Sequence, residues 1–225
     1  MTVHAVVAPD GLTATAAVPH DCVVVVDEAA TPSGRALARA AAVLEREPSV
    51  GTVFIDVDGK TREGVQPGAR WLREAAARGT DTVGARCAVL RRATFEAAGQ
   101  QGLGTRRGEL SLWLRAAALA DVAHVAEPLP LTQLSSAASP SAHRATGAVG
   151  QITELHERAR AFHELFEGFA PLRGEPRLRT ATYRALAHSI RSRAWVAAYE
   201  GDSVEASLCL HLARDVNRWR RQRLP

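Results

Sequence analysis

The sequence predicts an α/β domain followed by a helical region, and three observations lead to this prediction. The segment 22–26 contains four consecutive valines, so it is apolar on both faces, as in a strand buried on both sides of a sheet. Strand and helix patterns alternate from there to about residue 135. After residue 150 the sequence carries only long helical patterns. We therefore expect an α/β domain over 1–135, a linker rich in Ser, Ala and Gly over 136–150, and a helical region over 151–225.

Four more strands are predicted by short runs of apolar and β-branched residues that end at turn residues. The polar stretch 60–68 is predicted to be a loop, because it follows the turn signal Asp58-Gly59 and shows no alternation. The four additional strands span 3–8, 52–57, 82–90 and 122–125.

The helices are predicted from apolar periodicity and from capping residues. Ser33 is a predicted N-cap, because a serine side chain can accept a hydrogen bond from a backbone N–H of the first turn. Gly201-Asp202 predicts a turn between the last two helices. Two antiparallel helices cannot bury their apolar faces alone, so we expect them to pack on the α/β domain or on a partner. The predicted helices span 35–46, 71–78, 93–98, 109–120, 151–169, 177–199 and 203–220.

The charge of the chain is mildly positive and unevenly distributed. The 225 residues carry a net charge of +4. The stretch 170–225 holds 11 arginines against 5 acids, a net +6. A basic region of this kind can attract nucleic acid or anionic lipid. However, its arginines are spread along helical segments, so we interpret them as a solvated helical face and do not expect a nucleic-acid partner.

The cysteines and the apolar runs indicate a cytoplasmic protein. Cys22, Cys87 and Cys209 lie far apart and form no C-x-x-C motif, so we expect buried free thiols in a reducing compartment. The sequence shows no signal peptide and no apolar run of transmembrane length.

Two carboxylates follow the valine run directly. Asp27 and Glu28 come at the carboxyl end of the predicted strand, and this end of the strands is where open α/β sheets bind ligands. A carboxylate pair there is suited to a divalent cation and, through the cation, to a diphosphate. The competing interpretation is that both are solvated residues leading into the next helix.

Four segments resemble the family 2 glycosyltransferases of the GT-A fold. The run Asp21–Gly59 resembles the part of that family in which a buried strand ends in Asp-x-Asp and an "E-x-x-P-x-V-G" segment follows, here Glu45–Gly51. The segment 84–99 resembles the stretch before the family's "G-G-F" turn. Gly108–Arg115 resembles the "E-D-Y-D-L-W-L-R" helix start, and 125–129 resembles the "E-P-L" exit strand. The resemblance covers 3–135 and implies a partial GT-A fold, with a mixed sheet flanked by helices.

The resemblance also implies a site and a reaction. The family transfers a sugar from a nucleotide sugar, and a metal or cations neutralise the leaving diphosphate. In this chain Asp27 would bind Mn²⁺ or Mg²⁺ with Glu28 as a substitute ligand, and Glu109 would be the general base for the acceptor hydroxyl. Arg91 and Arg92 could replace the metal as phosphate ligands. Their competing interpretation is an exposed strand end.

Four departures from the family pattern put catalysis in doubt. A first segment of about 50 residues, which holds the nucleotide base, has no counterpart. The third residue of Asp-x-Asp is Ala29, and the Glu-Asp pair is Gly108-Glu109. The stretch 132–135, where the family often has "Y-R-x-H", carries no charge.

We therefore carry three hypotheses. In the first, the chain is a degenerate glycosyltransferase-like domain that acts as a binding or scaffold module. In the second, it is an active transferase with a reduced or metal-independent donor site. In the third, another polypeptide or an upstream segment supplies the absent strand and helix, because unpaired sheet edges invite a further strand. The third hypothesis predicts a protein partner, and the apolar helices after residue 150 also fit a homo- or hetero-oligomer.

Overall fold

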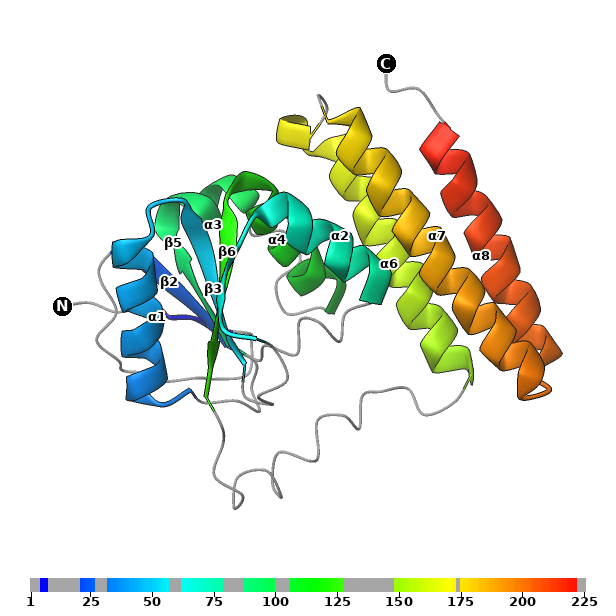
Figure 1. Cartoon of the computed structure of the whole chain (residues 1–225), viewed down its shortest axis with the longest axis horizontal. Helices are drawn as coiled ribbons and strands as arrows, with labels where there is room; N and C mark the ends of the chain where they lie inside the picture. The colour runs from blue at the N-terminus through cyan, green and yellow to red at the C-terminus, as the bar shows by residue number, and fades with distance from the viewer. Residues whose placement is uncertain are drawn as a thin grey trace. The chain divides into compact units, whose positions relative to one another are not determined.

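The computed structural model describes residues 5–7, 21–26, 32–56, 62–78, 87–99, 106–127, 148–172 and 175–221 (Figure 1). The chain divides into two compact units, each considered by itself below. The first unit comprises Met1–Trp71 and Asp81–Ser139, and the second comprises Leu72–Thr80 and Pro140–Pro225. Most of the predicted linker 136–150 lies outside the described residues.

The first unit is built on a mixed sheet, so the predicted α/β class is confirmed for the described residues. The strand order is β1-β2-β5-β3-β6-β4. The pairings make β1, β2, β3 and β6 parallel to one another, with β5 and β4 running the opposite way. The strands are β1 (Ala5–Val7), β2 (Cys22–Val26), β3 (Val50–Asp56), β4 (Gly64–Gln66), β5 (Cys87–Arg91) and β6 (Asp121–Ala126).

The central strands are apolar along their whole length because helices cover both faces of the sheet. Every residue of β3 is buried. On one face, Leu37 and Leu44 of helix α1 (Gly34–Arg46) pack in a core with Val53. On the other face, Phe54 stacks on Trp71 with ring centroids 5.5 Å apart and meets Trp113 edge-on at 5.4 Å. Figure 1 shows α1 and α4 (Arg106–Leu119) on opposite faces of this sheet.

Local signals located the helices of this unit well. The Ser33 side chain accepts a hydrogen bond from the Ala36 N–H at 3.1 Å, so the predicted N-cap of α1 is confirmed. The remaining helices of the unit are α3 (Arg92–Ala98) and the start of α2 (Gly68–Arg78).

The sequence predicts a loop over 60–68, but strand β4 lies within this stretch. It has only three residues, and it includes Gly64 at a φ of +139°, which an L side chain rarely adopts. Its extended conformation comes from antiparallel pairing with β6 at the edge of the sheet, where Val65 lies opposite Ala123. No pattern within the segment itself carries that information.

The second unit contains three long helices: α6 (Ala148–Gly168), α7 (Pro176–Tyr199) and α8 (Ser203–Arg221), with the short 3-10 helix η3 (Ala170–Leu172) after α6. The predicted turn between α7 and α8 is confirmed. Gly201 has a φ of +84°, and the Asp202 N–H donates to the Ala197 carbonyl at 2.8 Å, which together form a Schellman ending. The Asp202 side chain then caps α8 by accepting from the Glu205 N–H at 2.8 Å.

An ion pair inside this unit fixes the register of α7 against α8. Glu205 is 1% exposed and accepts two hydrogen bonds from the Arg193 guanidinium, at 2.5 and 2.9 Å. Near the other end of the same two helices, Arg179 donates to the Trp219 carbonyl at 2.8 Å. The two contacts join late α7 to early α8 and early α7 to late α8, so the helices are antiparallel.

Candidate functional site

The parallel strands bring their carboxyl ends to one edge of the sheet, which we call the carboxyl rim. Asp56 is the last residue of β3, and Glu127 follows the last residue of β6. Strand β2 ends at Val26, and Asp27 and Glu28 follow it in the sequence outside the described residues. Open α/β sheets bind ligands at this edge, so it is the place to look for a site.

Polar contacts tie the end of β6 to helix α1. The Arg39 guanidinium donates to the Ala126 carbonyl at 2.9 Å and to the Glu63 carboxylate at 2.7 Å. The same Glu63 oxygen accepts from the Ala126 N–H at 2.8 Å. These hydrogen bonds, with that from Arg39 the largest influence, lower the pKa of Glu63. Arg39 and Glu63 therefore hold the rim together.

Asp56 and Glu127 are linked through the backbone. The Glu127 N–H donates to the Asp56 carbonyl at 2.8 Å, and the Glu127 carboxylate accepts from the Ser33 N–H at 3.3 Å. Asp56 is only 4% exposed. Among the residues that the structure describes, no group of three or more His, Cys, Asp or Glu side chains is placed to hold a metal ion. The described residues of the rim therefore do not form a site for Mn²⁺ or Mg²⁺ by themselves, and such a site would need Asp27.

The backbone of Glu109 lies at the level of the carboxyl rim. Helix α4 runs antiparallel to β3, because Ala120 lies against Gly51 while Trp113, earlier in the helix, packs on Phe54. Glu109 comes one turn before Trp113, a shift of about 6 Å at 1.5 Å per residue. The two residues from Phe54 to Asp56 cover about the same distance along β3, at about 3.3 Å per residue. The predicted general base is thus placed at the predicted edge, and its side chain lies outside the described part of the structure.

The two arginines proposed as phosphate ligands lie at the other end of the sheet, which corrects the predicted grouping. Arg91 pairs with Cys22 at the start of β2, whereas Cys87 pairs with Val26 at its end. Arg91 is therefore about 13 Å from the rim, four residues along the strand. Arg92 begins α3 and donates its N–H to the Asp21 carbonyl at 2.6 Å. The reason for the difference is that β5 runs antiparallel to β2, so its carboxyl end is not at the rim.

Arg91 has a structural function where it lies. Its guanidinium donates to the Val50 carbonyl at 2.8 Å, to the Glu47 carbonyl at 3.2 Å and to the Leu44 carbonyl. These carbonyls belong to the C-terminal end of α1 and the start of β3. A cation at a helix C-terminus is favourable, because the exposed carbonyls there carry partial negative charge. The competing interpretation of an exposed strand end also does not describe Arg91, which is half-buried.

Sequence reasoning overlooked Asp56 and the Arg39–Glu63 pair. Asp56 gave the same signal as Asp27, an acid at the end of a buried strand, and could have been found by applying that rule to each strand. Arg39 and Glu63 gave no signal, because their partners come from β6, far away in the chain.

Comparison of the chain with family models, curated proteins and solved structures finds no match. Within the described residues, none of the helices has the length and apolar character needed to cross a bilayer.

Proposed function

We propose that the chain is a degenerate family 2 glycosyltransferase-like domain, whose carboxyl rim binds a nucleotide sugar as part of a binding or scaffold module. One observation carries this proposal. The segments that resemble the family, separated along the chain, contribute four strands that are consecutive neighbours in the sheet, in the order β2-β5-β3-β6. The carboxyl ends of β2 and β3 thereby lie at a single rim, and Asp27 and Glu28 follow β2 in the sequence.

The positions of the arginines favour a binding module over a metal-independent transferase. Departure of a diphosphate needs positive charge at the leaving group. Arg91 and Arg92 lie at the far end of the sheet, and Arg39 is ion-paired with Glu63. The proposal therefore assigns neutralisation of a diphosphate to a divalent cation that Asp27 would bind, and Ala29 weakens that site because it supplies no second carboxylate.

The experiment is calorimetric titration with UDP, GDP and dTDP sugars, each with and without Mn²⁺. We expect binding of one donor, strengthened by the metal and lost in Asp27→Asn. Glu96→Gln, which neutralises an exposed acid on α3, is the matched control and should bind like the wild type. Failure of every donor to bind a folded sample would refute the nucleotide-sugar site.

An active transferase is the second candidate, and the placement of Glu109 favours it. The backbone of Glu109 on α4 lies level with Asp56, and a base in this position would serve an acceptor hydroxyl that meets a donor held at the rim. In this case release of nucleoside diphosphate is measured, and Glu109→Gln should abolish it while leaving the donor affinity within about twofold of the wild type. Turnover that survives Glu109→Gln would exclude Glu109 as the base.

A partner that completes the sheet remains part of the proposal. In the described sheet β1 is an edge strand of three residues, bonded to β2 on one side. A short edge strand offers backbone N–H and carbonyl groups for a further strand. Light scattering coupled to size exclusion tests this, since a strict monomer that binds a nucleotide sugar unaided would count against a required partner.

A further inference from the structure

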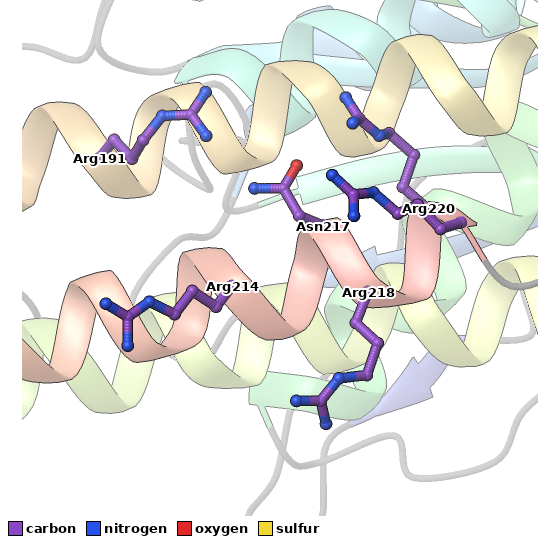
Figure 2. A pocket seen from close by; sticks show the side chains of 6 residues that line it. Arg191, Arg214, Asn217, Arg218 and Arg220 are labelled. Atoms are coloured by element: carbon purple, nitrogen blue, oxygen red, sulfur yellow. The ribbon is translucent and has the colours of Figure 1, made fainter.

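Five arginines of the helical unit surround one open hollow between α7 and α8. The hollow has a volume of about 610 Å³. Figure 2 shows that Arg191 comes from α7 and that the other labelled residues come from α8. We call this surface the arginine groove; its lining residues are Arg191, Arg214, Asn217, Arg218, Arg220 and Arg221.

The positive charge of the groove is hardly compensated. Asp215 approaches Arg218 at 3.7 Å on the exposed side of α8. Within the described residues the other four arginines of the groove form no ion pair. Soluble proteins normally intersperse charges of both signs, so a patch of net charge about +4 favours an anionic ligand. Arginine suits phosphate in particular, because its planar fork of N–H donors matches the phosphate oxygens.

The face of α7 that carries Arg191 also carries an exposed aromatic residue. Arg184, His188, Arg191 and Trp195 follow one another at spacings of four, three and four, so they share one face of the helix. Trp195 is 77% exposed, although tryptophan is normally largely buried. The basic face therefore ends in a flat apolar ring that is open to solvent.

The directions of the side chains fit an extended ligand better than a single phosphate. In Figure 2 the guanidinium groups of Arg191, Arg214 and Arg218 end at separate places along the two helices and do not converge on one point. A chain of phosphates can meet several of them in turn. An anionic bilayer fits less well, because Glu200, beside the 95% exposed Tyr199, forms an ion pair with Arg193 at 3.6 Å, so this end of α7 is less positive than the groove.

We propose that the arginine groove binds single-stranded nucleic acid, with the arginines on consecutive phosphates and a base stacked on Trp195. Arginine contacts to the backbone and stacking on exposed aromatic rings are the two interactions by which proteins bind single strands without reading their sequence. The sequence pattern alone favours a solvated helical face. The antiparallel packing of α7 on α8 changes this interpretation, because it adds Arg191 to the arginines of α8.

The test is fluorescence anisotropy of the full chain with labelled oligouridylate and oligothymidylate of about 16 nucleotides. The salt concentration is varied between about 50 and 200 mM KCl. For the triple variant R191A/R214A/R221A we expect at least tenfold weaker binding. The slope of log K against log salt should fall by about 2, since each lost phosphate contact removes about 0.7. Trp195→Ala should weaken binding about fivefold or more and abolish the quenching of tryptophan fluorescence by the oligonucleotide.

The control variant R35A/R46A/R62A removes three exposed arginines from the other unit, and with them the same net charge. It should retain wild-type affinity within about twofold. Three results would overturn the proposal: no saturable binding at low salt, an equal loss in the control variant, or binding confined to vesicles that contain anionic lipid. Unchanged affinity and quenching in Trp195→Ala would overturn the stacking contact and with it the assignment to single strands. Circular dichroism of each variant confirms that it is folded.

Discussion

Arg91 lies directly opposite Cys22 across strands β5 and β2, at the amino end of β2. This pairing separates Arg91 from the carboxyl rim by the length of the strand. It also places the guanidinium under the last turn of α1, where three backbone carbonyls accept its hydrogen bonds. The pairing of Arg91 with Cys22 therefore explains why Arg91 stabilises the fold and why it is absent from the candidate site.

Arg91→Ala is expected to destabilise the protein without changing the binding of a nucleotide sugar. A hydrogen bond from a charged donor contributes about 1.5–3 kcal/mol, and the three bonds are not additive, so we expect a loss of about 2–4 kcal/mol. Urea denaturation measures the loss. Arg46→Ala removes an exposed arginine that, among the described residues, donates only to the Ala42 carbonyl of its own helix, and should cost less than about 1 kcal/mol. A stable Arg91→Ala protein with impaired nucleotide binding would contradict this assignment.

Removing one partner of the Arg193–Glu205 pair should destabilise the protein far more than replacing both partners with apolar residues. Glu205→Ala leaves the Arg193 charge in a partly buried position, and Arg193 has a side-chain exposure of 25%. We expect a loss of about 2–4 kcal/mol, somewhat below the cost for a fully buried pair. The double variant Arg193→Met with Glu205→Leu should recover most of it, because two apolar side chains need no compensating charge.

A double-mutant cycle on these two positions separates the pair from the general loss of packing. A coupling energy near zero would mean that the two side chains contribute independently, despite their hydrogen bonds of 2.5 and 2.9 Å. The exposed pair Arg160–Glu164 on α6, 3.7 Å apart, is the comparison and should show less than about 1 kcal/mol.

Elements with local signals could be predicted from the sequence, and elements defined by pairing could not. The Ser33 cap and the Gly201 turn depend on neighbouring residues, so α1, α7 and α8 were predicted within a residue or two of their ends. Strand β4 exists because it pairs with β6.

The residues of the candidate site also divide into those with a local signal in the sequence and those whose position depends on pairing. An acid after a buried strand is visible in the sequence, as for Asp27 and Asp56. The sequence does not show at which end of the sheet Arg91 lies, because that depends on whether β5 runs parallel or antiparallel to β2. Likewise, Arg191 lines the same hollow as Arg214 only because α7 packs on α8.

The three cysteines should be unreactive in the native protein. All three thiols are free and buried. Burial is the main cause that raises the pKa of Cys22 to about 11 and that of Cys87 to about 12, and it also raises the pKa of Cys209. Since the thiolate is the reactive form, a disulfide reagent at neutral pH should modify the native chain only through transient opening.

Unfolding in denaturant should expose three titratable thiols per chain. The variant Ser207→Cys places a thiol at an exposed position of α8 and provides the rate for an accessible cysteine. A native thiol that reacts as fast as this one would show that its surroundings are more open than the structure indicates.

His163 should make the helical unit less stable in acid. Its ring stacks on Trp219 with centroids 4.3 Å apart, and its Nδ1 lies 3.2 Å from the Tyr183 hydroxyl. Burial is the main cause that lowers the pKa of His163 below its ordinary value of 6.5, partly opposed by Glu167 and Glu164 and reinforced by Arg179.

A lowered pKa means that the unfolded chain binds a proton more readily than the folded chain. The stability contributed by neutral His163 is therefore complete above about pH 6.5 and is lost progressively as the pH falls below that value. We expect the free energy of unfolding of the wild type to fall more between pH 7 and 5 than that of His163→Gln, which cannot take up the proton. His156→Gln, an exposed histidine on the same helix, is the matched control. Urea denaturation at each pH gives the three curves, and parallel curves for the wild type and His163→Gln would show that His163 titrates alike in the folded and unfolded chains.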